Sequence, residues 1–451
     1  MDLNLSKPIL LKCGLVLPNR LVKAAMAECL GNANEDHLPG SQKCLAIYQE
    51  WARGGWGLII TGNVQVDPAH LGDLHDFAIN GALPEAPTLA AFTAWANACS
   101  NNGKTKALVQ LCHPGRQIAF SRGTVAPSAI PMDFGTALVP RLLNAFVFGA
   151  PRAMTIAEIQ ATIRHFANAA RLVAAAGFAG VELHAAHGYL LAQFLSPRCN
   201  VRTDAYGGSA RARARLVVEI IQAVREAVPP GFCVGLKFNS VDVGSAADMG
   251  ECMEQLRAIT EAGIDFLEIS GGSFEDPTFS TGPGAVGEAE VKKASTLARE
   301  AFFIDFAQAI RAQFRNLPLM VTGGFRSRRS MEAALSKGSC DLVGLARPAV
   351  MNPMLPRTLM LSPDIPEQDA VQHVKRIPPG RAARFLGIRL IGVGPERDWY
   401  TKQIQLIGTL NGSNSLTSAS AGRKSWVPQI LSFTIVVAFF LWFKKLYWLH
   451  L

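Results

Sequence analysis

AGVELHAAHGY, residues 179–189, is an apolar β-type run that becomes polar at its end. Within six positions it carries His184, His187 and Tyr189, which supply hydrogen-bond donors and a weak acid. Such groups can hold a carbonyl oxygen and deliver a proton. A single histidine here would more simply be a buried structural residue or a metal ligand, but three such groups at one strand end favour a site. The stretch therefore predicts a strand that ends in a functional loop.

The same alternation of an apolar β-type run with a helical segment occurs along most of the chain. Strands are expected at residues 20–26, 57–61, 105–111, 179–183, 233–238, 266–270, 319–322 and 341–345. Helices are expected at residues 41–53, 86–100, 155–176, 209–227, 248–262, 297–314 and 327–337. Eight such alternations predict an α/β protein with a (β/α)8 TIM barrel rather than a doubly wound sheet. No G-x-G-x-x-G dinucleotide fingerprint follows any of the strands.

Two segments do not fit this alternation. A Pro/Gly-rich insertion runs to about Arg152 after the third strand and is too long for a routine connection, so it is expected to form a lid or a wall of the site. The pattern also degrades over residues 363–425, where the polar tract 411–422 (NGSNSLTSASAG) predicts a flexible tether. The barrel is therefore assigned to residues 1–362, and residues 363–425 form an extension and linker.

Composition limits the classes of function. The chain has 451 residues, 49% of them hydrophobic, and its 44 Lys and Arg against 35 Asp and Glu give a net charge of +9. This excess suits phosphorylated ligands or anionic membranes, but no basic block interleaved with aromatic residues indicates nucleic-acid binding. The nine cysteines are scattered and contain no C-x-x-C pair. They are expected to be reduced thiols of a cytosol-facing protein rather than disulfides or ligands of a metal cluster.

The chain's end differs in composition from its start. The first twenty residues lack the features of a secretory signal. Residues 427–443 (VPQILSFTIVVAFFLWF) carry no charge and are flanked by basic pairs and by interfacial aromatic residues. This pattern predicts one membrane-spanning helix over residues 426–443 with a short basic and aromatic tail at 444–451. A tail anchor with the catalytic domain in the cytosol is the simplest topology, and a buried core helix is the alternative.

In a barrel the carboxyl ends of all strands meet on one face, so the residues at these ends are expected to share a site. Gly323-Gly324 and Ala346-Arg347 follow the last two strands, where barrels commonly bind phosphate. Gln110 offers a donor and an acceptor to the edge of a heterocycle. Lys237 is a cation in an apolar strand, which is costly without an anion or an electron-rich ligand. The alternative for Lys237 is a side chain whose stem leads out of the barrel.

Four sequence motifs together resemble the Old Yellow Enzyme family of FMN-dependent NAD(P)H oxidoreductases and ene-reductases. They are HAAHGYL (184–190), FLSPRCNVRTDAYGGS (194–209), NRLVKAAM (19–26) and VTGGF (321–325). The resemblance covers residues 5 to 360 approximately. It implies FMN at the mouth of the barrel, with NADPH or NADH as the reductant and an α,β-unsaturated carbonyl compound as the oxidant.

The resemblance also implies roles for individual residues. His184 and His187 would hold the substrate's carbonyl oxygen, and Tyr189 would protonate its α-carbon after hydride transfer to the β-carbon. Gln110 and Lys237 would contact the pyrimidine edge of the flavin. The other flavin and phosphate contacts would come from Ala25, Ala27, Gly62, Gly323, Gly324, Ala346 and Arg347. Ala27 stands where the family often has Thr or Cys, so the side chain that tunes the flavin is missing here.

Two alternatives from other classes remain. A metal-dependent hydrolase would use Glu182, His184 and His187, whereas the flavoenzyme interpretation requires no metal. A non-catalytic adaptor tethered to the membrane would keep the barrel as a binding module. The expected partners of the flavoenzyme are a small-molecule enone and, through the C-terminal helix, a membrane; a homo-oligomer is left open.

Overall fold

The computed structural model describes residues 2–31, 36–121, 123–134, 138–239, 246–271, 304–377 and 389–409. The chain divides into two compact units, residues 1–412 and 413–451, and every described residue belongs to the first. The expected tether at 411–422, the membrane helix at 426–443 and the tail at 444–451 therefore lie outside the described residues.

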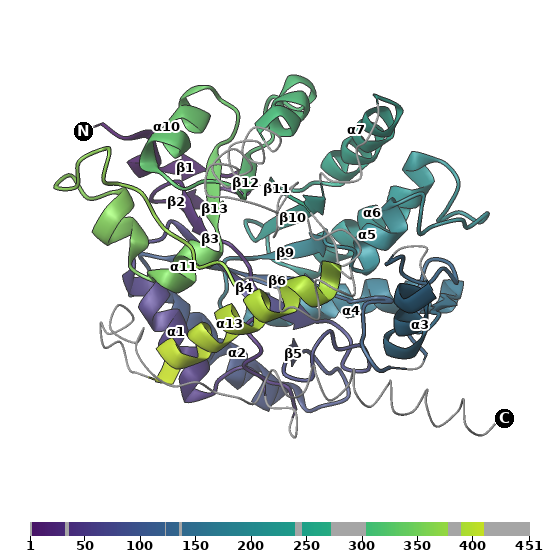
Figure 1. Cartoon of the computed structure of the whole chain (residues 1–451). Helices are drawn as coiled ribbons and strands as arrows, with labels where there is room; N and C mark the ends of the chain where they lie inside the picture. The colour runs from purple at the N-terminus through teal and green to yellow at the C-terminus, as the bar shows by residue number, and fades with distance from the viewer. Residues whose placement is uncertain are drawn as a thin grey trace. The chain divides into compact units, whose positions relative to one another are not determined.

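Eight parallel strands close into a barrel, as the alternation predicts (Figure 1). In order around the barrel they are β3 (Leu21–Lys23), β4 (Leu58–Gln65), β6 (Lys106–Cys112), β9 (Gly180–Ala185), β10 (Cys233–Asn239), β11 (Phe266–Ser270), β12 (Leu319–Thr322) and β13 (Leu342–Leu345). Closure comes from β3, which pairs with both β13 and β4. The short strand β5 (Phe77–Ala78) adds to the carboxyl end of β4.

Helices surround the strands (Figure 1). They include α1 (Gln42–Arg53), α2 (Glu85–Ser100), α4 (Ile156–Ala175), α6 (Ala210–Ala227), α7 (Ala246–Glu261) and α10 (Arg328–Ser336). Residues 304–313 form a further helix between β11 and β12. The capping box predicted for α4 is present, since the Thr155 side chain accepts from the Glu158 N–H and the Glu158 carboxylate accepts from the Thr155 N–H. Helices α1, α6 and α10 each begin with a serine whose side-chain oxygen accepts a backbone N–H of the first turn.

The inward-facing side chains of the barrel form two layers. The layer near the amino ends of the strands is apolar and contains Val22, Leu58, Leu108, Phe266, Met320 and Leu342. The hairpin of β1 (Ile9–Leu10) and β2 (Val16–Leu17), which follows the short helix η1 (Asn4–Ser6), adds Leu11 and Leu17 to this cluster. Two residues further along β6, β11 and β12, on the same face, the side chains are polar, namely Gln110, Glu268 and Thr322, whereas β3 and β4 carry Ala24 and Ile60 there. This change of layer places the site at the carboxyl ends.

Several elements lie outside the strand and helix alternation. The insertion after β6 holds β7 (Val125–Ala126), α3 (Leu138–Val147) and β8 (Arg152–Ala153), and the turn after β9 leads into α5 (Leu190–Leu195). Helix α11 (Arg347–Met351) follows β13, and η2 (Pro356–Met360) is one π-helical turn.

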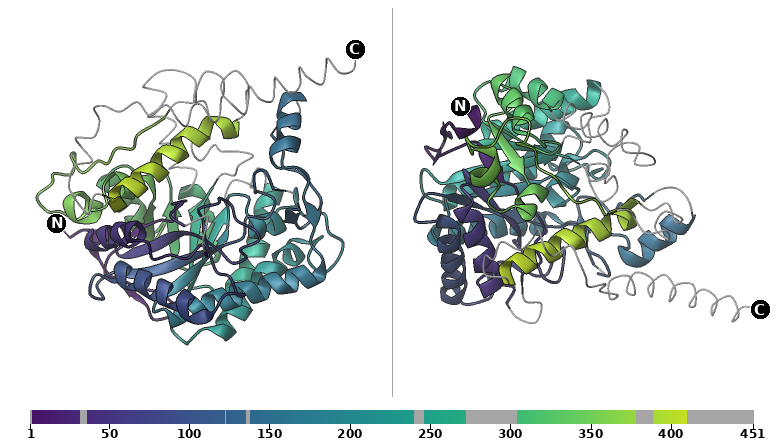
Figure 2. Two further views of the ribbon diagram at one scale, coloured as in Figure 1. Left: turned by 90° about the horizontal axis from the view of Figure 1, so that it is seen from below. Right: turned by 60° about the vertical axis from the view of Figure 1, so that its left-hand side comes forward.

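A long C-terminal helix, α13 (Arg389–Thr409), lies within the predicted extension, where the sequence pattern indicated no helix. It packs against α1 and α11 and appears as the yellow-green helix in both views of Figure 2. None of the helices in the described part of the chain is long and apolar enough to cross a membrane.

The close packing inside the barrel can be tested at Gly235. Its register partner on β11 is Phe266, and a Cβ at position 235 would lie 2.2 Å from that ring. We expect Gly235→Ala to lower the free energy of unfolding by about 1–3 kcal/mol, because a closely packed core cannot absorb the extra methyl group. Denaturant titration would measure the loss.

The control variant for this test is Gly250→Ala. Gly250 lies on the exposed side of α7, and a Cβ there would meet nothing within 4 Å. Alanine is favoured over glycine in a helix, so this variant should be as stable as the wild type or more stable. An equally stable Gly235→Ala protein would contradict the described packing.

Candidate functional site

The turn that follows β9 brings the two histidines and the tyrosine together. His187 and Gly188 both adopt left-handed backbone angles, with φ of 57° and 75°. Gln117 holds the turn from the β6 side, donating its side-chain N–H to the His187 carbonyl oxygen over 3.0 Å. The ring of His184 lies 5.1 Å from that of His187 and 4.7 Å from that of Tyr189, centroid to centroid. The structure thus brings these three side chains together in one cluster.

A buried ion pair lies beside this cluster. Lys237 on β10 and Glu268 on β11 are register partners, and Nζ of the lysine is 2.8 Å from Oε1 of the glutamate. The lysine's other neighbour across the sheet is His184. Both charged side chains are buried, with exposed fractions of 3% and 0%. Lys237 therefore lies inside the barrel and does not lead out of it.

A second carboxyl group, Glu182 on β9, shares this interior. Burial raises its pKa well above the usual value, and the nearby charge of Glu268 raises it further. Burial also acts to raise the pKa of Glu268, but Lys237 and a hydrogen bond from Glu182 lower it overall. We conclude that Glu182 keeps its proton while Glu268 is ionised, so the pair holds one negative charge opposite one lysine.

Gln110 joins this network from β6. Its side-chain N–H donates to Glu182 Oε1 over 2.7 Å. The predicted contact of Gln110 with a heterocycle is therefore left to its side-chain carbonyl oxygen, which lies 3.7 Å from the weak thiol donor of Cys112.

Both imidazoles are neutral at physiological pH. Burial, with the charge of His187 and Lys237 added, lowers the pKa of His184 well below its usual value. Burial and then Lys237 lower the pKa of His187 to about 3. His187 Nε2 lies 3.0 Å from Ser270 Oγ, while Nδ1 of His184 has no hydrogen-bond partner among the described residues. Neutral imidazoles can donate one hydrogen bond each to a carbonyl oxygen without attracting an anion.

Tyr189 is arranged as a proton donor. Burial, followed by the charge of Asp76, raises its pKa well above the usual value, so the phenol remains protonated. Asn63, at the end of β4, donates its side-chain N–H to the Tyr189 hydroxyl oxygen over 2.9 Å. Since this bond uses a lone pair of the oxygen, the O–H proton is free to point to another acceptor.

The remaining predicted flavin contacts line the same end of the barrel but differ in their packing. Ala25 packs against the barrel core, and the carbonyl oxygen of Ala27 accepts from Thr401 of α13 over 3.4 Å. A Cβ on Gly62 would lie 2.6 Å from the Met26 carbonyl oxygen, so close packing requires a glycine there.

The last strand ends also carry their predicted residues. Gly323 and Gly324 have left-handed φ angles of 133° and 80°. Ala346 caps α11, and Arg347 makes an ion pair with Glu396 of α13.

The geometry gives no support to a metal site at Glu182, His184 and His187. Glu182 is protonated and bonded to Gln110, and these three do not form one of the convergent ligand groups found among the described residues. One group that does converge contains Asp67, His70 and His113, but Nδ1 of His113 accepts from the Gly115 N–H. Its other ring nitrogen therefore carries the proton and cannot bind a metal in this state.

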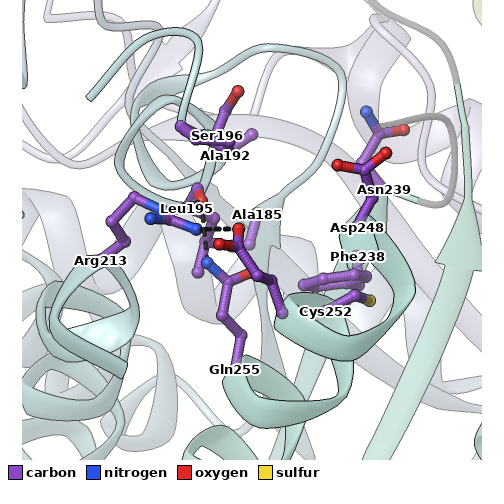
Figure 3. A pocket seen from close by; sticks show the side chains of 12 residues that line it. Ala185, Ala192, Leu195, Ser196, Arg213, Phe238, Asn239, Asp248, Cys252 and Gln255 are labelled. Atoms are coloured by element: carbon purple, nitrogen blue, oxygen red, sulfur yellow. Dashed lines mark hydrogen bonds and ion pairs between the residues drawn. The ribbon is translucent and has the colours of Figure 1, made fainter. Parts of the chain in front are cut away.

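A pocket lies between strands β9 and β10 and helices α5, α6 and α7 (Figure 3). Its lining includes Ala185, Phe238 and Asn239 at the ends of the two strands. The guanidinium group of Arg213, in the pocket wall, donates hydrogen bonds to the Glu251 carboxylate and to the carbonyl oxygens of Leu195 and Gly208. The pocket thus borders the candidate site but does not include its histidines or tyrosine.

Sequence reasoning missed several polar partners of the site. Asn63 and Ser270 lie at or near strand ends, and this position was the signal that could have identified them, whereas Glu268 lies in the middle of β11 and carried no such signal. It also missed a second buried ion pair, in which Lys23 Nζ lies 2.8 Å from Glu28 Oε1. Lys23 faces outward from β3 and stacks over the Trp51 ring of α1, so this pair joins the barrel to a helix.

The residues present fit a flavin. The mouth of the barrel offers a buried cation at Lys237, the carbonyl oxygen of Gln110 and an unpartnered ring nitrogen of His184. A cation suits the flavin's pyrimidine edge, which becomes anionic on reduction, and the imidazoles suit a carbonyl oxygen above it.

Comparison with known proteins identifies the family of this chain. Residues 4–362 match the model of the NADH:flavin oxidoreductase / NADH oxidase family. The NADH-dependent flavin oxidoreductase iccE of Talaromyces variabilis is 46% identical over 416 residues, which cover 90% of this chain and 98% of that protein. The NADH-dependent flavin oxidoreductase iliE of Neonectria sp. (strain DH2) is also 46% identical, over 88% of this chain, but the match spans only 53% of that protein.

Solved structures show the same fold. Morphinone reductase in complex with tetrahydroNAD has a TM-score of 0.61 and 25% identity, covering 78% of this chain and 89% of that one. A 2-naphthoyl-CoA reductase has a TM-score of 0.65 with 24% identity, over 78% of this chain and 51% of that one.

The protonation state of Glu182 can be tested by its effect on stability. Its pKa is raised in the folded protein, so the folded state binds more protons than the unfolded state above the usual value of 4.5. The stabilisation is fully present below that pH and is lost as pH rises through the folded pKa. Because Gln does not titrate, Glu182→Gln should gain stability relative to the wild type as pH rises from about 4.5, measured by denaturant unfolding at several pH values.

The control for this test adds Glu268→Gln to Glu182→Gln. The double variant leaves Lys237 buried with no carboxylate opposite it, which should cost about 3–5 kcal/mol at neutral pH. A Glu182→Gln protein that lost stability relative to the wild type with rising pH would show that Glu182 is ionised.

Proposed function

The chain belongs to the NADH:flavin oxidoreductase / NADH oxidase family, and we propose that it reduces the C=C bond of α,β-unsaturated carbonyl compounds. It is an oxidoreductase with FMN as its cofactor and NADH or NADPH as its reductant. The observation that carries the proposal is the cluster of two neutral imidazoles and one protonated phenol beside Lys237.

Each side chain of the cluster has one task in this proposal. Bound FMN supplies the hydride that reaches the β-carbon of the substrate. His184 and His187 each donate one N–H to the carbonyl oxygen, which draws electron density from the C=C bond. Lys237 stabilises negative charge at the pyrimidine edge of the flavin. Because both imidazoles are neutral, they bind a neutral enone without the cost of placing three cations together.

Tyr189 completes the reduction by giving its proton to the α-carbon. The Asn63 N–H fixes the phenol oxygen, so the proton points away from that bond and toward the substrate. The relatives that are 46% identical are named NADH-dependent, which favours NADH over NADPH as the reductant of this chain.

Tyr189→Phe tests the proton donor. We expect the oxidation of the reduced protein by 2-cyclohexenone to slow by about 10²-fold or more, because general acid catalysis contributes roughly that much. The flavin content and the rate of reduction by NADH should stay unchanged. Anaerobic stopped-flow absorbance measures the two half-reactions separately.

The control is Tyr206→Phe, which removes a phenol that binds Gln160 and Glu219 away from the site. It should leave both rates at their wild-type values. Equal oxidation rates for Tyr189→Phe and the wild type would remove Tyr189 from the role of proton donor.

We further propose, from sequence alone, that residues 426–443 anchor the protein in a membrane with the barrel in the cytosol. The support is the uncharged length of residues 427–443 with basic residues on both sides. The full chain should float with liposomes in a density gradient, whereas a chain ending at Gly422 should remain in the soluble fraction. Identical behaviour of the two chains would reject the anchor.

A further inference from the structure

The segment that follows the family match is fixed at the end of strand β12. The match ends at residue 362, yet residues 370–372 run beside the loop that begins with Gly323 and Gly324. Gln372 donates its backbone N–H to the Arg326 carbonyl oxygen over 2.8 Å and its side-chain N–H to that of Phe325 over 2.8 Å. This segment therefore belongs to the edge of the barrel mouth.

Helix α13 holds the next residues of the segment. The Tyr400 hydroxyl donates to the Lys375 carbonyl oxygen over 2.9 Å, and the Ile377 N–H donates to Glu396 Oε2 over 3.2 Å. The residue between these two bonds is Arg376. Its backbone is thus held on both sides, although its side chain is 39% exposed.

Two guanidinium groups meet one carboxylate at this place. Glu396, which is buried, pairs with Arg347 through Oε1, and the same oxygen lies 3.8 Å from Arg376 Nη1. Burial, and then the charge of Arg347, lowers the pKa of Arg376, as expected for two cations side by side. Arg347 and Arg376 thus place two guanidinium groups around one carboxylate beyond the end of strand β13.

A pair of neighbouring guanidinium groups suits a phosphate group. Barrels frequently bind phosphate at the loops after their seventh and eighth strands, which here are β12 and β13. A phosphate monoester carries close to two negative charges at neutral pH and accepts several hydrogen bonds from guanidinium groups. Glu396 holds the two guanidiniums together when like charge alone would separate them.

We propose that Arg376, together with Arg347, binds the phosphate group of FMN, so that a segment beyond the family barrel completes the cofactor site. Glu396 acts as the positioning residue that keeps both guanidiniums at the mouth. This inference rests on the proposed flavin chemistry and adds a cofactor-binding residue to it.

The test compares FMN with riboflavin, which is the same ring system without the phosphate. We expect Arg376→Gln to weaken FMN binding by the apoprotein about tenfold, since hydrogen bonds to charged groups contribute at least this much. Riboflavin affinity should not change, which would also show that the variant is folded. Quenching of flavin fluorescence measures both dissociation constants.

Lys375→Gln is the matched control, because it removes a neighbouring positive charge whose Nζ lies 4.8 Å from the Trp399 ring centroid. It should leave the ratio of FMN to riboflavin affinity at the wild-type value. If Lys375→Gln and Arg376→Gln lower the ratio of FMN to riboflavin affinity equally, the loss comes from the general positive charge and not from a contact of Arg376. That result would overturn the assignment.

Two further outcomes would overturn the assignment in distinguishable ways. If Arg376→Gln leaves FMN affinity unchanged but lowers the rate of reduction by NADPH and not that by NADH, the guanidinium binds the 2′-phosphate of the reductant instead. If the wild-type apoprotein binds neither FMN nor riboflavin, the proposed function fails together with this inference.

Discussion

The ion pair of Lys237 and Glu268 is the constraint on which the interior of this barrel depends. A lysine inside a barrel needs an anion, and Glu268 provides it from the next strand in register. A second carboxyl group, Glu182, lies in the same space and can remain there only because it keeps its proton. Because Glu182 is protonated, the two carboxyl groups carry one negative charge, which balances the positive charge of Lys237. Lys237 can therefore lie beside the histidines without an excess of positive charge.

The two layers of the barrel separate stability from function. Apolar side chains near the amino ends fill the barrel and are sealed by the N-terminal hairpin, whereas polar side chains occupy the carboxyl ends. The burial that neutralises His184 is a consequence of this arrangement, because the imidazole lies above an apolar core and beside a cation. The mouth is then bordered by residues from far along the chain, where α13 contacts the loop after β3 and the start of α11.

Much of the fold could be predicted from the sequence because strands and helices alternate with clear periods, and the eight strands lie within a few residues of their expected places. The cluster of His184, His187 and Tyr189 was predictable because the carboxyl ends of barrel strands converge. Helix α13 was not, since Gly394 and Pro395, which usually break helices, lie within it and mask the helical pattern of the sequence. Glu268 was missed because a lone carboxylate in an apolar strand has no sequence signature that identifies its partner, and Lys237 becomes its partner only through strand register.

The central claim is that this barrel binds FMN and passes electrons from a nicotinamide to an enone. The most direct measurement is the visible absorbance spectrum of the purified protein under anaerobic conditions, recorded before and after NADH and again after 2-cyclohexenone. The account predicts a flavin band that bleaches with NADH and returns with the enone. A colourless protein that cannot be reconstituted with FMN, or a flavin band that NADH bleaches and the enone does not restore, would contradict it.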